Sequence, residues 1–152
     1  MIQRIQTLFL IGAMISLGVL FLIPLGHLIP PNEMILNFQF NGIQADKIVE
    51  NAYQTIPLTI LMGMTVFLSF ITILMYKNRI LQIRLSGINI FLIIGQTGMF
   101  LYYFFDAAKQ IDAEKQFNIS IVLPIVAIIF LYLAIRGIAR DEALVKAADR
   151  IR

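Results

Sequence analysis

The sequence contains no cysteine and a single histidine in 152 residues. Without cysteine the chain has no disulfide, no thiolate metal site and no cysteine nucleophile, and nothing about the redox state of its compartment can be read from it. His27 cannot form a histidine cluster by itself, so we expect it to make an interfacial hydrogen bond rather than to bind a metal. We therefore expect no metal site and no cofactor.

Charged residues are also scarce. Only 14% of the residues are charged and 59% are hydrophobic, compared with about 25% and about 45–50% in soluble domains. The formal net charge of +3 would suggest nucleic acid as the partner of a soluble protein, but here the basic residues stand at the ends of apolar runs. The composition predicts an integral membrane protein surrounded by membrane lipids, with no nucleic acid as a partner.

Four apolar runs are long enough to cross a bilayer, which takes about 18–20 helical residues. They cover residues 8–28, 56–76, 85–105 and 117–135. The predicted fold is an all-α membrane protein with one domain, a bundle of four transmembrane helices over residues 1–152. A basic N-terminus before an apolar stretch also begins a signal peptide, but no small-residue cleavage site follows, so we interpret the first run as a span. Pro124 is expected to bend the fourth span.

The connection over residues 29–55 is long enough to fold outside the membrane. Residues 36–40 alternate between apolar and polar, which is typical of a half-buried strand, and Asn41-Gly42 is typical of a hairpin turn. We therefore predict a small β-hairpin in this first extracytoplasmic loop, and we expect residues 46–54 to restart a helix. Residues 106–116 are expected to form a frayed helix end followed by a turn.

Lysine and arginine are distributed unevenly among the connections. Nine lie at the N-terminus, in the second connection and in the tail over residues 136–152, whereas three lie in the first and third connections. Because cytoplasmic segments keep the excess of basic residues, both termini are predicted to be cytoplasmic.

The C-terminal tail is the segment richest in charge. Residues 140–152 contain neither glycine nor proline, so we expect them to continue the fourth helix. This helix end is either solvated or a docking helix for a partner or for the membrane surface. The candidate docking residues are Arg136, Arg140, Asp141, Glu142, Leu144, Val145, Lys146 and Arg150.

The four runs contain no Asp, Glu, Lys or Arg, which argues against an ion-coupled transporter or pump. Uncharged polar residues instead form one stripe on each of the second and third spans. We expect the stripes to meet inside the bundle and to hydrogen-bond between helices; the alternative is a small polar cavity around Asn89 and Gln96. The stripes consist of Thr65, Ser69 and Thr72, and of Ser86, Asn89 and Gln96.

Both ends of the chain resemble one family of proteins. The stretches that carry the likeness are MIQRIQT (1–7), LAIRGI (133–138), RDEALVK (140–146) and DRIR (149–152). They are similar to uncharacterised four-span inner-membrane proteins of Gram-negative bacteria, a family defined as a domain of unknown function. The resemblance covers the whole chain and implies a bacterial inner membrane and four spans, but no activity, substrate or catalytic residue. The layout is also similar to that of claudin-like proteins, although the chain lacks their loop cysteines and tryptophan.

A non-enzymatic role is the first hypothesis for function. The chain would be an accessory or scaffold subunit that binds another membrane protein or a second copy of itself. Its surfaces would be the outer loop, the tail, or small-residue pairs such as Gly12 with Ser16 and Thr59 with Gly63. The alternative is a lipid- or small-solute-binding or transport protein that uses the polar face of the second and third spans. An enzyme comes third, because few nucleophiles or bases are present.

Overall fold

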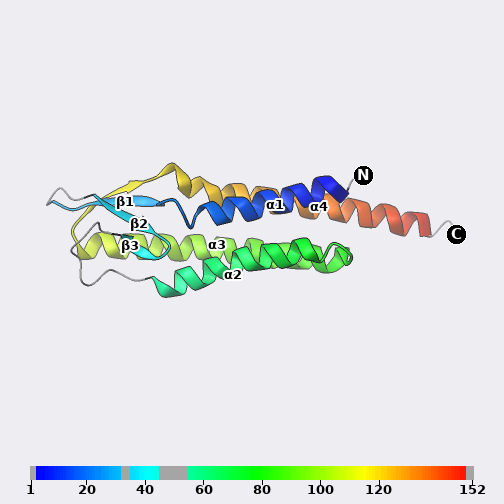
Figure 1. Ribbon diagram of the computed structural model, residues 1–152, viewed down its shortest axis with the longest axis horizontal. Helices are drawn as coiled ribbons and strands as arrows, with labels where there is room; N and C mark the ends of the chain where they lie inside the picture. Colours follow the sequence, from blue (N-terminus) through cyan, green and yellow to red (C-terminus); the bar gives the residue numbers. More distant parts are fainter. Residues whose placement is uncertain (1–2, 32–34, 45–54, 150–152) are drawn as a thin grey trace.

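The computed structural model describes residues 3–31, 35–44 and 55–149 as helices joined by short strands (Figure 1). The helices are α1 (Gln3–Val19), α2 (Ile56–Leu74), α3 (Arg79–Gln110) and α4 (Leu123–Asp149), and a 3₁₀-helix, η1 (Ile119–Val122), precedes α4. The strands are β1 (Gly26–Ile29), β2 (Leu36–Gln39), β3 (Gly42–Gln44) and β4 (Glu114–Phe117). The helix expected over residues 46–54 lies outside the described residues.

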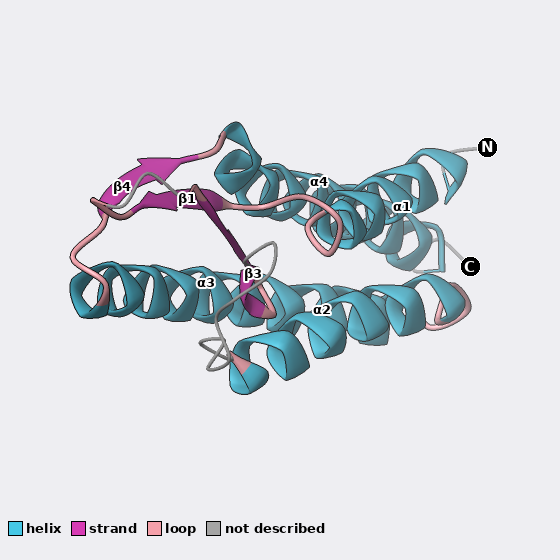
Figure 2. Ribbon diagram, turned by 60° about the vertical axis from the view of Figure 1, so that its left-hand side comes forward, coloured by secondary structure: helices cyan, strands magenta, loops and turns pink. Residues whose placement is uncertain are grey.

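The four helices lie side by side and alternate in direction. α1 packs against α4 and α2, and α3 packs against the same two helices. Both chain ends lie at one end of these helices, the termini end, and the strands lie at the other, the sheet end (Figures 1 and 2). The last turns of α4 extend beyond the other helices at the termini end (Figure 1).

Each helix packs through one narrow seam. Its buried residues follow one another at intervals of mostly three and four, which is the 3.5-residue repeat of knobs-into-holes packing. The seams contain Gln6, Leu10, Ala13, Leu17 and Leu20 from α1 and its end, Leu58, Met62, Thr65, Ser69 and Thr72 from α2, Gln82, Ser86, Asn89, Ile93, Gln96, Phe100 and Phe104 from α3, and Ala127, Leu131, Ala134, Ile138 and Asp141 from α4.

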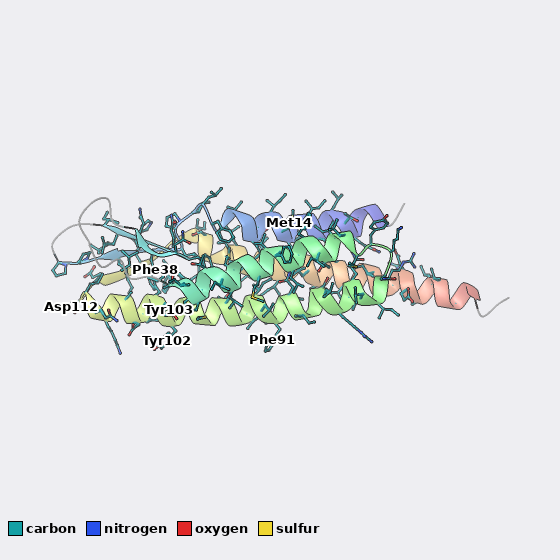
Figure 3. The ribbon with its side chains drawn as sticks, turned by 60° about the horizontal axis from the view of Figure 1, so that its bottom comes forward. Met14, Phe38, Phe91, Tyr102, Tyr103 and Asp112 are labelled. Carbon is teal, nitrogen blue, oxygen red and sulfur yellow. The ribbon has the colours of Figure 1, made fainter. Side chains whose placement is uncertain are left out.

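Large apolar side chains cover the outside of the helices. Phe91 on α3 is 77% exposed and points away from the other helices, as does Tyr102 (Figure 3). Exposed apolar surface of this extent marks contact with a membrane or with another protein. Among the described residues, three helical segments are long and apolar enough to cross a membrane, namely Ile56–Leu74, Arg79–Gln110 and Ile119–Val145, whereas α1 supplies a shorter apolar segment, Ile5–Val19.

The expectation of one helix over residues 8–28 is wrong in its second half. The chain leaves the helix after Val19 and enters β1 at Gly26. Pro24 carries no N–H group and disfavours helical geometry in the residue before it. Its carbonyl accepts hydrogen bonds from Asn118 Nδ2 at 3.2 Å and from Ser120 Oγ at 2.5 Å, so the segment before α4 holds the exit of α1 in place.

The predicted hairpin is present as β2 and β3, but it belongs to a larger antiparallel sheet with the order β3-β2-β1-β4. Its turn is Phe40-Asn41, one residue earlier than expected, and Gly42 begins β3 with a φ of 112° that glycine adopts without strain. The helix end and the turn expected over residues 106–116 are both present, but the turn at residues 111–112 is followed by β4, which pairs with β1 and was not predicted. The fold is therefore mostly helical with a small antiparallel sheet, rather than all-α with one hairpin.

Two further boundaries differ from expectation for local reasons. α3 runs six residues further toward its N-terminus than the predicted span and ends after Gln110, where Asp112 has a φ of 51° and the Ala113 N–H bonds to the Ala108 carbonyl. This is a Schellman motif, which accounts for the sharp turn into β4. Pro124 is the second residue of α4, where no N–H partner is needed, so it begins the helix instead of bending it.

An aromatic cluster fixes the sheet to α3. Phe38 of β2 packs edge-on against Phe100 and Phe104, with ring centroids 5.7 Å and 5.4 Å apart. β1 passes so close to this cluster that a Cβ atom on Gly26 would lie 2.7 Å from the Phe104 ring. The interior is therefore aromatic at the sheet end and becomes polar toward the termini end.

Candidate functional site

The most polar part of the interior lies between α2 and α3. The two helices form a hairpin with a short turn, so residues at equal distances from the turn face each other. Thr65 Oγ1 donates to Gln96 Oε1 at 3.1 Å, and Asn89 Nδ2 donates to Ser69 Oγ at 2.6 Å. We call this set the polar seam; it consists of Thr65, Ser69 and Thr72 on α2 and Gln82, Ser86, Asn89 and Gln96 on α3.

Gln82 extends the polar seam toward the termini end, and the sequence analysis did not single it out. Its Nε2 donates to the Thr72 carbonyl at 3.1 Å. Gln82, Asn89 and Gln96 follow one another at intervals of seven, so they share one face of α3. That repeat is visible in the sequence and would have identified Gln82 as a buried residue.

Two atoms of the polar seam have no hydrogen-bond partner among the described residues. They are Ser86 Oγ and Asn89 Oδ1, and both side chains are fully buried. The hydroxyl groups of Ser69 and Thr72 differ in this respect, because each donates to a carbonyl of its own helix. The single proton of Thr65 Oγ1 is shared between the Met62 carbonyl and Gln96 Oε1. A buried polar atom left unsatisfied costs about 1–3 kcal/mol, so this pair is the place in the seam where a water molecule or a small polar ligand would be accommodated.

A second polar contact joins the two ends of the chain. Gln6 Nε2 on α1 donates to Asp141 Oδ2 on α4 at 2.6 Å, and Asp141 is only 9% exposed. Gly137 makes the approach possible, because a Cβ atom there would lie 3.0 Å from Gln6 Cγ. Sequence reasoning placed Asp141 on a docking surface and overlooked Gln6, although both continue the repeat of buried residues in their helices.

The predicted docking residues of the tail do not form one surface. Arg136, Arg140, Leu144 and Val145 are exposed, whereas Asp141 is buried against Gln6. Glu142 faces α3, with its Oε2 3.9 Å from Arg79 Nη1. The side chain of Lys146 and the whole of Arg150 lie outside the described residues. The expectation that the tail continues α4 is confirmed as far as Asp149.

A cleft of about 620 Å³ opens at the termini end, between the first turns of α1, the last turn of α2 and the first turn of α3. We call it the termini-end cleft. Leu8, Ile73 and Leu74 give it an apolar wall, and Gln6 and Gln82 place amide groups in it. Arg79 is the one charged side chain among its described lining residues. The cleft thus combines a hydrocarbon-like wall with a polar, basic end.

Glycines lie on the face of α3 opposite the polar seam. Gly87, Gly95 and Gly98 are exposed, and a Cβ atom on any of them would meet nothing within 4 Å. Phe91 and Tyr102 lie among them and point outward (Figure 3). Glycine is about 1 kcal/mol less favourable than alanine inside a helix, and no contact with the described part of the chain requires it here. We call this surface the outer glycine face of α3.

The two small-residue pairs that were predicted to form contacts with a partner make different contacts in the structure. A Cβ atom on Gly12 would lie 3.2 Å from the Phe130 ring, and Ser16 Oγ donates to the Gly12 carbonyl, so this pair serves the contact between α1 and α4. Thr59 Oγ1 donates to the Phe40 carbonyl at the sheet end, whereas Gly63 is open to the outside. The outer glycine face of α3 was missed, although the spacing of eight residues between Gly87 and Gly95 could have revealed it.

The ionisable side chains form no cluster typical of metal binding within the described ranges. No three His, Asp or Glu residues lie together there as metal ligands would. His27 Nδ1 is 2.8 Å from Asn37 Oδ1 on the neighbouring strand β2, which makes it part of the sheet's surface.

Comparison with known proteins adds a family but no activity. The model of the family described as Domain of unknown function (DUF4293) matches residues 2–151. No curated protein and no solved structure matches the chain. The resemblance of the sequence to an uncharacterised family is thereby confirmed over nearly its whole length. The chain belongs to the DUF4293 family, a domain of unknown function.

Proposed function

We propose that this protein is a non-enzymatic accessory or scaffold subunit of the bacterial inner membrane, which docks onto a transmembrane helix of a partner through the outer glycine face of α3. It crosses the membrane four times, with both termini in the cytoplasm. The apolar outer surface of the helices and the excess of basic residues at the termini end support this placement. The sheet then lies on the extracytoplasmic side.

Helix lengths fit this placement. α3 has 32 residues and would be about 48 Å long, more than the roughly 30 Å of a hydrocarbon core, so its last turns leave the membrane beside the sheet. α1 has 17 residues and is the shortest of the four described α-helices. It crosses together with the turn that follows it, where Phe21 and Leu22 continue the exposed apolar surface.

The observation that carries the proposed role is the open space around Gly87, Gly95 and Gly98. Lipid chains give membrane helices no hydrophobic reason to associate, so small residues that allow close backbone approach are typical of helix contacts. The matching interior contact in this chain, Gly12 against Phe130, is already filled. An outward face with the same property fits a helix supplied by another chain.

The experiment compares Gly95→Leu with Gly18→Leu, a matched change at another open position, on α1. Each variant is purified from native membranes in mild detergent at endogenous level. We expect a stoichiometric partner with the wild type and with Gly18→Leu. Gly95→Leu should weaken the retention of this partner by about tenfold or more, because a bulky side chain in a close helix contact costs about 1–3 kcal/mol.

A partner retained equally by both variants would contradict the role of this face. Release only on deleting residues 140–152 would assign docking to the tail.

The alternative, a small polar ligand bound in the polar seam, is favoured by one observation. Ser86 Oγ and Asn89 Oδ1 lack partners among the described residues. The rest of the seam argues against a large ligand there, because its side chains are buried and bonded to each other or to their own helix. Partner purification also separates the two roles, since a clean monomer with a small bound solute would favour the alternative.

A further inference from the structure

The termini-end cleft combines three kinds of lining, and it differs from the two adjoining hollows in having no carboxylate among its described lining residues. Its wall is formed by apolar side chains that also face outward, since Leu8 and Leu74 are both more than half exposed. Its interior end holds the amides of Gln6 and Gln82, each of which uses one N–H in a bond described above and keeps a second N–H. Its one charged lining residue within the described ranges is Arg79.

Positive charge gathers around this end of the cleft. Arg79 is the first residue of α3, and Asn78 makes no side-chain capping bond, so the positive end of the helix dipole adds to the guanidinium charge. Lys77 and Arg84 line the adjoining hollow of about 750 Å³. Two carboxylates partly offset this charge. Asp141 Oδ2 accepts from Gln6 Nε2 at 2.6 Å, which leaves the second N–H of Gln6 for a ligand. Glu142 lies 3.9 Å from Arg79, which is a long separation between partly exposed side chains, so that pair is weak.

We propose that the termini-end cleft binds one anionic phospholipid, with its phosphate at Arg79, Gln6 and Gln82 and one acyl chain along Leu8 and Leu74. An arginine fork and amide N–H groups are suited to a phosphate. The apolar wall opens to the outer surface, so the ligand that fits is an anion attached to hydrocarbon rather than a free ion. This inference rests on the membrane placement proposed above and is independent of the partner.

The absence of tryptophan provides a clean test. Leu74→Trp places a single fluorescent reporter in the cleft wall, and Phe67→Trp places one two turns away on the outward side of the same helix, outside the described cleft lining. Each variant is reconstituted in phosphatidylcholine vesicles with a minor fraction of phosphatidylglycerol. In one preparation the phosphatidylcholine carries bromine on its acyl chains, and in a second preparation the phosphatidylglycerol carries bromine at the same acyl positions. The ratio of quenching by the two brominated lipids then measures lipid preference independently of reporter depth.

We expect the Leu74→Trp reporter to favour the anionic lipid about fivefold over the Phe67→Trp reporter, the contribution of one basic residue near an anionic surface. Adding Arg79→Gln to the Leu74→Trp chain should remove this preference, whereas Arg136→Gln, the same change on the exposed side of α4, should leave it. Glu142→Gln breaks the same ion pair as Arg79→Gln but should retain or raise the preference. That result would show that Arg79→Gln acts by removing the anion site and not by breaking the ion pair with Glu142.

Three results would overturn the lipid site. They are equal preference at both reporters, loss of preference with Glu142→Gln, and an emission shift caused by inorganic phosphate alone in phosphatidylcholine vesicles at matched ionic strength. The Phe67→Trp reporter tests the membrane placement by itself, because it is quenched by either brominated lipid only if α2 lies in the bilayer. A failed placement is therefore distinguishable from a failed lipid site.

Discussion

The polar seam shows what single residues do in this fold. Thr65, Ser69, Asn89 and Gln96 occupy positions that a soluble coiled coil fills with large apolar side chains. If these positions held apolar side chains in a membrane, α2 and α3 would have no preferred register, because such side chains pack against lipid as well as against the neighbouring helix. The bonds from Thr65 to Gln96 and from Asn89 to Ser69 define one register, because sliding either helix by a turn would break both.

Ser86 and Ser69 provide a matched pair for testing this reading. Ser86→Ala removes a buried hydroxyl that has no described partner, so we expect unchanged or slightly higher stability. Ser69→Ala leaves Asn89 Nδ2 without its acceptor and should cost about 1–3 kcal/mol. Thermal or denaturant unfolding of the purified protein in detergent measures both. A loss with Ser86→Ala equal to that with Ser69→Ala would mean that a bound molecule holds Ser86 in place.

At the scale of elements, α2 and most of α3 could be predicted from the sequence and α1 could not. α2 coincides with the apolar run from Ile56, because Pro57 lies in its first turn, where no N–H partner is needed, and no other proline follows in the run. The apolar run from Leu8 continues to residue 28, yet its helix already ends after Val19. Asn118 and Ser120 hydrogen-bond to the Pro24 carbonyl and hold the chain on its path into β1. These partners are distant in the chain, and no local pattern reports them.

The strands also differ in how far a local sequence pattern predicts them. The alternation over residues 36–40 predicted β2 from a local signal, since Phe38 and Leu36 are buried and Asn37 is exposed. β4 has the pattern Glu-Lys-Gln-Phe with all four residues exposed, so it carries no alternation of burial. It becomes a strand only because β1 offers an edge beside it. The same difference applies to the candidate sites. The polar stripes could be predicted from the spacing of their residues, whereas the termini-end cleft forms between three helices and could be found only once their arrangement was known.

Gly26 and Gly18 test how tightly the sheet is held against α3. Gly26→Ala places a methyl group within 2.7 Å of the Phe104 ring and 3.1 Å of the Gln116 carbonyl, so we expect it to cost about 1–3 kcal/mol. Gly18→Ala enters open space on α1 and should be neutral or stabilise by up to about 1 kcal/mol. The free energy of unfolding of the two variants gives the comparison. A tolerated Gly26→Ala would show that β1 can move away from the aromatic cluster.

At the scale of the whole molecule, the two ends of the helices differ in chemistry. The sheet end holds the aromatic cluster, whereas the termini end holds the Gln6–Asp141 contact, the basic residues around Arg79 and the termini-end cleft. This difference between the two ends is consistent with the proposed orientation, in which the termini end faces the cytoplasm. It also separates the two proposed binding surfaces, since the proposed lipid would lie at the termini end and the proposed partner helix would lie along the middle of α3.

The orientation can be measured directly because the chain has no native cysteine. Glu114→Cys on β4 and Ala147→Cys near the end of α4 are both at exposed positions. In intact bacterial cells whose outer membrane is permeable to the reagent, a maleimide that cannot cross the inner membrane should label Glu114→Cys at once. It should label Ala147→Cys only after the inner membrane is opened. The reverse pattern would overturn the orientation, and the cysteine-free chain is the control for background labelling.

The position of β1 between β2 and β4 has a consequence for how the protein is made. β1 and β2 leave the ribosome early, whereas β4 follows α3 and reaches the sheet only after three helices have been synthesised. Until then β1 presents an unpaired edge, which extended segments of other chains can join. A chain that stalls or fails to insert its last hairpin would keep that edge open. An incomplete chain would therefore be more prone than the finished molecule to pair with extended segments of other chains.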